Sequence, residues 1–171
     1  LGGDAPKQPK KRDDGWRCLV PVPDDAPPPP EAHPTLGRPS GRWFYASATG
    51  RLLGLANRFD AVDGSKQFRP ATLWERERDH RREWRWEAWP APRPLYGLDR
   101  LAERPKAAVV VCEGEKATVA AGRLLPDFVV MTSPNGSKSA SKADWSPLSG
   151  RRVTIWPDAD APGAAYAEEV A

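Results

Sequence analysis

Three acidic residues stand just after apolar runs of strand length, where their carboxylates could hold a metal ion. Glu113 directly follows "AAVVVC", and Asp158 and Asp160 follow "RRVTIW" after a single proline. Asp158 and Asp160 are two positions apart, so an extended backbone points both side chains in the same direction. Carboxylate oxygens suit Mg²⁺, which usually takes one or two carboxylates together with substrate phosphates. The pattern predicts a metal site made of Glu113, Asp158 and Asp160.

The elements around these residues must bring them together. From residue 107 onward, the apolar runs "AAVVVC", "DFVVMT" and "RRVTIW" predict strands, and "KATVAAGRLL" and the segment that contains Pro162 predict helices. This alternation is typical of a parallel sheet. Residues just beyond the carboxyl ends of parallel strands gather along one edge, where such folds bind ligands. The residues expected at that edge are Glu113 with Gly114, Asn135 with Gly136, and Asp158 with Asp160.

The same edge carries residues that could contact the phosphates of a nucleotide. Gly114 and Gly136 would let the backbone approach an anionic ligand closely, because glycine has no side chain. Asn135 and Lys138 belong to the turn "SPNGSK" that follows the second predicted strand. Lys116 either balances the carboxylates, touches a phosphate, or is an ordinary surface lysine of the first helical turn.

A purely structural explanation competes with the metal site. An Asp-x-Asp sequence before Pro-Gly is also typical of a turn that enters a helix, with one aspartate as the N-cap. Glu113 could likewise be a solvated turn residue. The residue types alone leave both explanations open.

The first part of the chain has a different composition. Residues 1–41 are basic and proline-rich and predict a largely disordered linker, with "WRCLV" as a short tethering strand. Residues 42–106 predict a β-rich subdomain, because two β-favouring runs flank Thr49-Gly50 as a hairpin and "KQFRPATLW" suits a further strand. With the α/β core over residues 107–171, the chain is expected to have an α+β fold.

Positive charge is concentrated ahead of the α/β core. Residues 1–106 contain 20 Lys and Arg against 15 Asp and Glu, whereas residues 107–171 contain 6 against 8. A polyanion would therefore be drawn to the first part. Compositional bias of the genome is the competing explanation for the many arginines. The candidates to contact a nucleic-acid strand, all beside predicted strands, are Arg58, Lys66 and Arg69.

The motif "VVVCEGEKATVAAGRLL" followed by "IWPDADAPG" resembles the TOPRIM domain of bacterial-type primases, topoisomerases, nucleases and recombination proteins. Glu113 matches the glutamate that the family places after its first strand, and Asp158 and Asp160 match its Asp-x-Asp. The form "EGEK" and the run from "SPNGSK" to "PDADAPG" are similar to the TOPRIM primase domains of phage and plasmid replication proteins. The resemblance covers residues 107–171, and more loosely the β-rich region before them.

The resemblance implies a DNA primase fragment that transfers nucleotides in primer synthesis, with Mg²⁺ or Mn²⁺ as its cofactor. The implied catalytic and metal-binding residues are Glu113, Asp158 and Asp160. The implied partners are a single-stranded DNA template, nucleoside triphosphates, and a helicase domain or protein. Two alternatives remain open: a metal-dependent nuclease, which uses the same acidic cluster, and a non-catalytic accessory piece that binds nucleic acid.

Two departures from the family pattern affect these expectations. Many bacterial primases carry an aspartate four residues after the glutamate, where this chain has Ala117. The TOPRIM fold normally continues with another strand and helix, so we expect a partial domain and weak or absent activity of this fragment alone. No segment approaches the roughly 20 apolar residues of a membrane span, and no signal-peptide pattern opens the chain. A cytoplasmic protein without a membrane partner is therefore expected.

Overall fold

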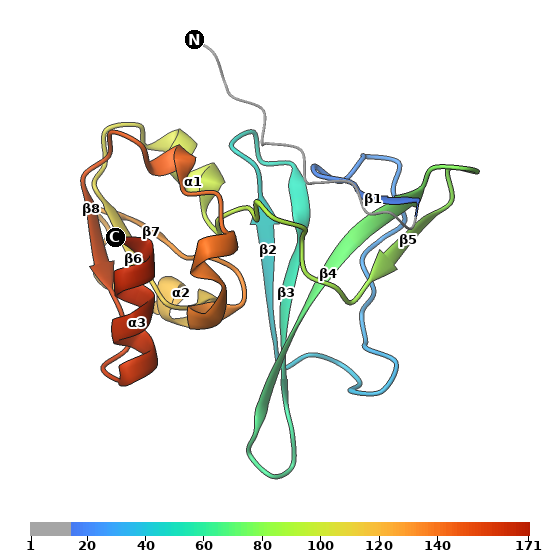
Figure 1. Cartoon of the computed structure of the whole chain (residues 1–171), viewed down its shortest axis with the longest axis horizontal. Coiled ribbons are helices and arrows are strands. Elements are labelled where there is room, and N and C mark those ends of the chain that lie inside the picture. The colour runs from blue at the N-terminus through green and yellow to red at the C-terminus, as the bar shows by residue number, and fades with distance from the viewer. Residues whose placement is uncertain (1–14) are drawn as a thin grey trace.

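A computed structural model describes residues 15–171, apart from the side chains of Ser137 and Lys138. Over the described residues the chain forms a five-stranded antiparallel sheet and a separate three-stranded parallel sheet, which lie beside each other (Figure 1). The α+β fold class predicted from the sequence is confirmed. The division into segments 1–41, 42–106 and 107–171 stays a prediction.

The antiparallel sheet is built around one long hairpin. Its strands are β1 (Trp16–Cys18), β2 (Gly41–Ala46), β3 (Leu52–Asp60), β4 (Lys66–Arg76) and β5 (Arg82–Arg85). Their order is β1-β4-β3-β2, and β5 also pairs with β4. The turn between β2 and β3 contains Gly50 with φ of 78°, a left-handed conformation that favours glycine. The hairpin predicted around Thr49-Gly50 is therefore present.

Residues 15–40, predicted as part of a linker, lie against the antiparallel sheet. β1 pairs with β4, and the backbone N–H of Val22 donates to the carbonyl of Leu52 at 2.7 Å. The indole N–H of Trp84 donates to the carbonyl of Pro27 at 2.8 Å. Proline lacks a donor but keeps its carbonyl acceptor, so an extended proline-rich segment can be held by donors of a neighbouring sheet. The structure does not show the expected disorder here, and residues 1–14 lie outside the described residues.

The parallel part alternates strands and helices as expected. Its elements are α1 (Leu98–Glu103), β6 (Val109–Cys112), α2 (Glu115–Leu124), β7 (Val129–Met131), the 3₁₀ helices η1 (Gly136–Lys142) and η2 (Ser146–Leu148), β8 (Val153–Trp156) and α3 (Ala161–Val170). β6 is central and pairs in parallel with β7 on one side and β8 on the other. The sequence pattern did not predict α1, which begins after Gly97.

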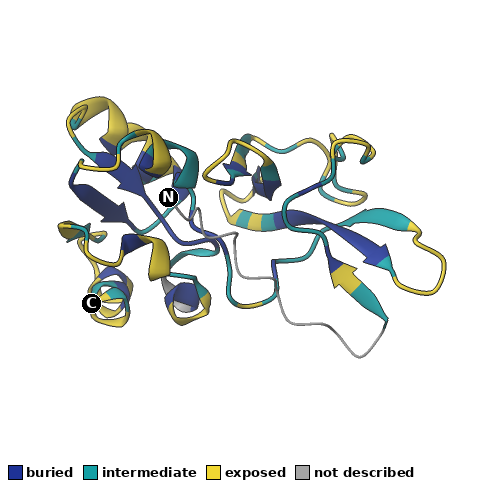
Figure 2. Cartoon of the chain, turned by 90° about the horizontal axis from the view of Figure 1, so that it is seen from above, coloured by how far each residue is buried: buried dark blue, intermediate teal, exposed yellow. Residues whose placement is uncertain are grey.

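The central strand β6 is buried on both faces, which explains its continuous apolar sequence. Val109 and Val111 belong to a core cluster that includes residues of α1, η1 and α3, whereas Val110 and Cys112 pack with residues of α2. Figure 2 shows these buried strands between helices that expose their outer faces. β8 is the exposed edge of the sheet, since Trp156 keeps 51% of its surface accessible.

The two sheets are joined by backbone and side-chain contacts. The N–H of Tyr96 donates to the carbonyl of Thr132 at 2.9 Å, just beyond the end of β7. Tyr45 of β2 packs its ring against that of Tyr96, with centroids 5.3 Å apart. The residues that lead out of the antiparallel sheet therefore run along the carboxyl edge of the parallel sheet. Within the described part of the chain, no helix is long and apolar enough to cross a membrane.

Candidate metal centre

Glu113 and Asp158 leave neighbouring strands at the same edge of the parallel sheet. Cys112, the last residue of β6, is the register partner of Trp156, the last residue of β8. Glu113 follows Cys112 directly, and Asp158 follows Trp156 after one proline. Burial raises the pKa of the Cys112 thiol, and the negative charge of Asp158 raises it further, so this carboxylate acts on the end of β6. Glu113 and Asp158, which are far apart in the sequence, thus follow the ends of neighbouring strands.

One carboxylate oxygen of Glu113 is buried without a hydrogen-bond partner. Among the described residues, Oε2 of Glu113 is one of two buried side-chain polar atoms in this state. A buried acceptor without a partner costs about 1–3 kcal/mol, and more when the group is charged. Native structures contain few such groups, and each calls for an explanation such as an ion or a ligand. The lack of a partner for this oxygen is the structural observation that fits a metal at this edge.

Asp160 also has a structural role at the start of α3. Its Oδ1 accepts the backbone N–H of Gly163 at 2.8 Å, so Asp160 is the N-cap of the helix. The structural explanation considered for the Asp-x-Asp sequence therefore holds for this residue. Across the described residues, no group of three or more His, Cys, Asp and Glu side chains is arranged to hold a metal ion. A metal here would rest on Glu113 and Asp158, with other ligands from water or substrate.

Two residues of α3 that the sequence analysis did not select hold this edge in shape. A Cβ at Gly163 would collide with the backbone of Asp158, so glycine lets the Asp158 turn lie directly on the helix. The buried hydroxyl of Tyr166 donates to the carbonyl of Cys112 at 3.2 Å and lies 3.1 Å from the hydroxyl of Ser133. Tyr166 therefore connects α3 to the carboxyl ends of β6 and β7. Gly163 and Tyr166 are three positions apart and so share one face of the helix. This spacing is the sequence feature that could have indicated them.

The charge of Glu113 also reaches Tyr166. Burial raises the pKa of the Tyr166 hydroxyl, hydrogen bonds with Ser133 and Thr132 lower it, and the charge of Glu113 raises it. No hydrogen bond joins the phenol and the carboxylate among the described residues, so the charge of Glu113 acts on Tyr166 through space. The edge presents an acidic group beside a hydroxyl that stays protonated at neutral pH.

The predicted nucleotide-binding residues also lie at or near this edge. Gly114 is the N-cap of α2, and a Cβ at this position would project into open space. Asn135 and Gly136 follow β7 with φ of 69° and 63°, both left-handed. Lys116 is exposed on the first turn of α2. The side chain of Lys138 lies outside the described residues, and phosphate contacts of all five residues stay predictions.

A buried contact between the two sheets involves Glu115, which the sequence analysis missed. Oη of Tyr45 donates to Oε1 of Glu115 at 2.7 Å, and both side chains are buried. Burial raises the pKa of Glu115, and burial and the charge of Glu115 raise that of Tyr45. Because Glu115 is the first residue of α2, this bond fixes the turn at Glu113 against the antiparallel sheet. A partner 70 positions away leaves no local sequence signal.

The three predicted nucleic-acid contacts lie on the β3–β4 hairpin, whose outer end projects beyond the rest of the sheet (Figure 1). Arg58 forms an ion pair with Asp60 at 2.8 Å, and Lys66 is exposed opposite Asp60 in the register. Arg69 donates to the side chain of Gln67 and to the carbonyl of Phe68. Arg58 is thus engaged with an acidic neighbour, whereas no ion pair of Lys66 or Arg69 is seen among the described residues. Their role in binding stays a prediction.

Comparison with solved structures gives a remote similarity. One matching chain comes from a complex of the bacteriophage T7 lagging-strand DNA polymerase with primase domains of two gp4 subunits, bound to an RNA/DNA hybrid and dTTP. The identity is 16% and the TM-score 0.48, and the match covers 75% of this chain and 57% of that chain. This chain therefore spans little more than half the length of that relative.

Comparison of the sequence with curated proteins gives no match. A family model described as a domain of unknown function, DUF6371, matches residues 58–159. This region holds β4 through β8 and ends one residue after Asp158, so it includes both carboxylates that could share a metal. Because the match covers more than half of the sequence, the chain belongs to the DUF6371 family.

Proposed function

We propose that the chain is a TOPRIM-type nucleotidyltransferase fragment that uses Mg²⁺ or Mn²⁺ in primer synthesis for the replication of a phage or mobile element. The observation that carries the proposal is the buried, unpartnered Oε2 of Glu113 at the edge where Asp158 also lies. An acidic group kept without a protein partner, beside a second carboxylate, is what a metal that also binds phosphates requires.

The residues of this edge have different roles in the proposed mechanism. Glu113 and Asp158 would hold the metal, and Asp160 adds its charge while it caps α3. When bound, Mg²⁺ supplies charge to bind the phosphates of the incoming nucleotide and to stabilise the displacement. Glu113 stands at the end of a strand buried on both faces, so it is held well enough to accept the proton of an attacking 3′-hydroxyl as general base.

The nucleotide and the template would occupy the surroundings of this edge. Backbone groups at Gly114, Asn135 and Gly136 are proposed to contact nucleotide phosphates, together with Lys116 and Lys138. The template strand would lie on the antiparallel sheet, where Lys66 and Arg69 present positive charge and Arg58 could exchange Asp60 for a phosphate. A helicase domain or protein is the proposed partner in replication.

A metal titration tests the site without requiring turnover. Mn²⁺ should bind the wild type weakly, because the substrate phosphates that complete the shell are missing. Glu113→Gln and Asp158→Asn should each lower the affinity by at least about tenfold, since even residues that only support metal ligands have effects of this size. Asp127→Asn removes an exposed carboxylate at the opposite end of β7 and is the matched control. Equal binding by all four proteins would contradict the metal site.

Incubation with single-stranded DNA, nucleotides and Mg²⁺ then separates the kinds of activity. New oligonucleotides that disappear in Glu113→Gln support primer synthesis. Shortened DNA that depends on Glu113 indicates the nuclease, which shares the acidic edge. Intact DNA without new products, from a protein that binds Mn²⁺, indicates a non-catalytic nucleic-acid-binding piece.

A further inference from the structure

Arg93 carries the other buried polar atom without a partner. Among the side chains that the structure describes, Nη1 of Arg93 and Oε2 of Glu113 are the two buried polar atoms that make no hydrogen bond. One belongs to a cation and the other to an anion. A buried guanidinium nitrogen without an acceptor carries the same kind of desolvation cost as an unpaired carboxylate oxygen.

The backbone and the inner end of the Arg93 side chain are fixed. Its N–H donates to the carbonyl of Lys142 and its carbonyl accepts the N–H of Asp144, both at 2.7 Å. Its Nε donates to the carbonyl of Trp89 at 3.0 Å. The guanidinium is therefore held in place by its Nε, while Nη1 is left over. This is a preorganised donor rather than a mobile surface side chain.

The charge of Arg93 is not balanced by carboxylates as that of Arg82 in β5 is. Hydrogen bonds to Glu75 and Asp25 raise the pKa of Arg82, whereas burial lowers that of Arg93. Among the described residues, no ion pair of Arg93 with a carboxylate is seen. A half-buried cation in this state favours an anion from outside the chain.

Arg93 also lies next to the elements that form the candidate site. It is three residues before Tyr96, which hydrogen-bonds to Thr132 at the carboxyl end of β7. It pairs with Ala143, at the end of the loop that begins with Asn135 and Gly136. Arg93 thus stands where the segment from the antiparallel sheet meets the loop that follows β7.

We propose that Arg93 is the main donor of an anion site that binds a phosphate group of a nucleotide or of a nucleic-acid strand. The planar guanidinium, fixed through Nε, offers Nη1 to a phosphate oxygen, and a charge-assisted bond of this kind is among the strong hydrogen bonds of proteins. The assignment of the phosphate to a nucleotide or a strand rests on the proposed function. The existence of an anion site rests on Arg93 alone.

Binding of inorganic pyrophosphate in the absence of metal tests the site directly. Calorimetry at low ionic strength would compare the wild type with Arg93→Met, Arg93→Lys and Arg38→Met. Arg38 is an exposed arginine paired with Glu31. Its replacement therefore removes the same charge from the exposed surface instead of from a half-buried position. Arg93→Met should weaken pyrophosphate binding about tenfold or more, Arg93→Lys less, and Arg38→Met less than about twofold.

Thermal unfolding separates a ligand site from a structural arginine. Without ligand, Arg93→Met should melt within about 2 °C of the wild type, because the lost Nε bond is offset by the removal of a buried charge. Pyrophosphate should raise the melting temperature of the wild type and not that of Arg93→Met. A large fall in melting temperature without ligand, or equal pyrophosphate binding by Arg93→Met and the wild type, would overturn the proposal. So would a wild type that does not bind pyrophosphate.

Two further binding measurements identify the molecule that carries the phosphate. Loss of affinity for a nucleoside triphosphate in Arg93→Met, with unchanged affinity for short single-stranded DNA, assigns the site to the nucleotide. The reverse pattern assigns it to a nucleic-acid strand. The metal titration of Glu113 and Asp158 is independent of these measurements, so the anion site can fail while the proposed function stands, and the converse also holds.

Discussion

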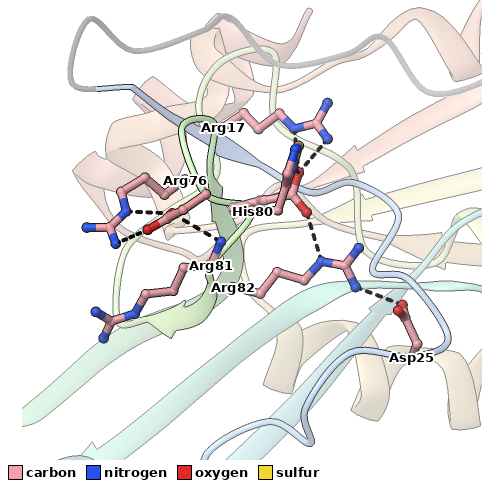
Figure 3. Close-up of polar contacts among 8 residues, drawn as sticks. Arg17, Asp25, Arg76, His80, Arg81 and Arg82 are labelled. Carbon is pink, nitrogen blue, oxygen red and sulfur yellow. Dashed lines mark hydrogen bonds and ion pairs between the residues drawn. The ribbon is translucent and has the colours of Figure 1, made fainter.

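Glu75 and Glu113 are two glutamates with opposite surroundings. Glu75 of β4 is 3% exposed and accepts hydrogen bonds from Arg82 Nε at 2.8 Å and from Arg17, with His80 Nδ1 at 3.5 Å. Figure 3 shows these three side chains converging from β1, β5 and the turn before β5. The bonds from Arg82 and then Arg17 lower the pKa of Glu75 to about 2. The carboxylate is part of the fold because it joins three segments.

Glu113 has the same functional group and lacks such donors for one oxygen. Burial of a charge therefore does not by itself indicate function. A carboxylate surrounded by fixed arginines is balanced within the chain, and an unpartnered one is kept for a ligand. Glu115 is an intermediate case, because its side-chain donor is the buried hydroxyl of Tyr45 and no arginine pairs with it among the described residues. The predictions below test these environments, and the turn at Asp158, through the free energy of unfolding.

The largest expected effect is at Glu75. Glu75→Gln should lower the free energy of unfolding by about 2–3 kcal/mol at neutral pH, because Arg82 and Arg17 lose a charged acceptor that is itself buried. Urea unfolding of the wild type and the variant measures this difference. Glu31→Gln is a control, since its pair with Arg38 is exposed on both sides and should change stability by less than about 1 kcal/mol. An equally small effect at Glu75 would remove the contrast with Glu113.

Low pH should remove the contribution of Glu75 to stability. The pKa of Glu75 is lowered from 4.5 to about 2, so its contribution to stability is present above about pH 4.5 and is lost as pH falls toward 2. The difference in unfolding free energy between wild type and Glu75→Gln should therefore shrink over that range. Arginine side chains do not lose their charge in proteins, so below the titration range of His80 the change reports the carboxylate. A difference that is constant from pH 6 to pH 2.5 would show that the ion pairs do not stabilise the fold.

Gly163→Ala should have the next largest effect. The new methyl group would meet the backbone of Asp158, and overpacking of this kind costs about 1–3 kcal/mol. Displacement of Asp158 should also weaken Mn²⁺ binding. Gly122→Ala is the matched control, because Gly122 is also within a helix and its Cβ would meet nothing. It should be neutral or slightly stabilising, by up to about 1 kcal/mol, through helix propensity.

Tyr45→Phe should cost about 1–2 kcal/mol, because it leaves the carboxyl group of Glu115 buried without its donor. Mn²⁺ affinity should fall as well, since the bond holds the start of α2 beside Glu113. Tyr96→Phe removes a hydroxyl on the neighbouring ring and is a suitable control. If both variants unfold and bind Mn²⁺ alike, the hydrogen bond between the two sheets contributes little to the site.

The sequence was informative where a local pattern reports burial. The run "AAVVVC" before Glu113 predicted a strand, and two similar runs predicted its neighbours, so the carboxyl edge followed from topology. Contacts between distant segments leave no such pattern. Tyr45 and Glu115 are 70 positions apart, and Tyr166 and Cys112 are 54 apart. The contacts of the proline-rich residues 15–40 could not be foreseen, because acceptor carbonyls leave no residue pattern until a sheet supplies the donors.

Glu113→Gln should have the smallest effect on stability and, unlike Glu75→Gln, should not lower the free energy of unfolding. The native protein already carries the cost of a buried, unpartnered carboxylate oxygen, so a neutral amide should leave the free energy of unfolding unchanged or raise it by up to about 1 kcal/mol. Mn²⁺ should stabilise the wild type and not the variant, because a ligand stabilises only the state that binds it. Glu75→Gln and Glu113→Gln therefore distinguish a glutamate that stabilises the fold from one that binds a ligand. If Glu113→Gln instead destabilises the fold as much as Glu75→Gln does, then Glu113 is balanced within the chain, and the metal assignment loses the observation on which it rests.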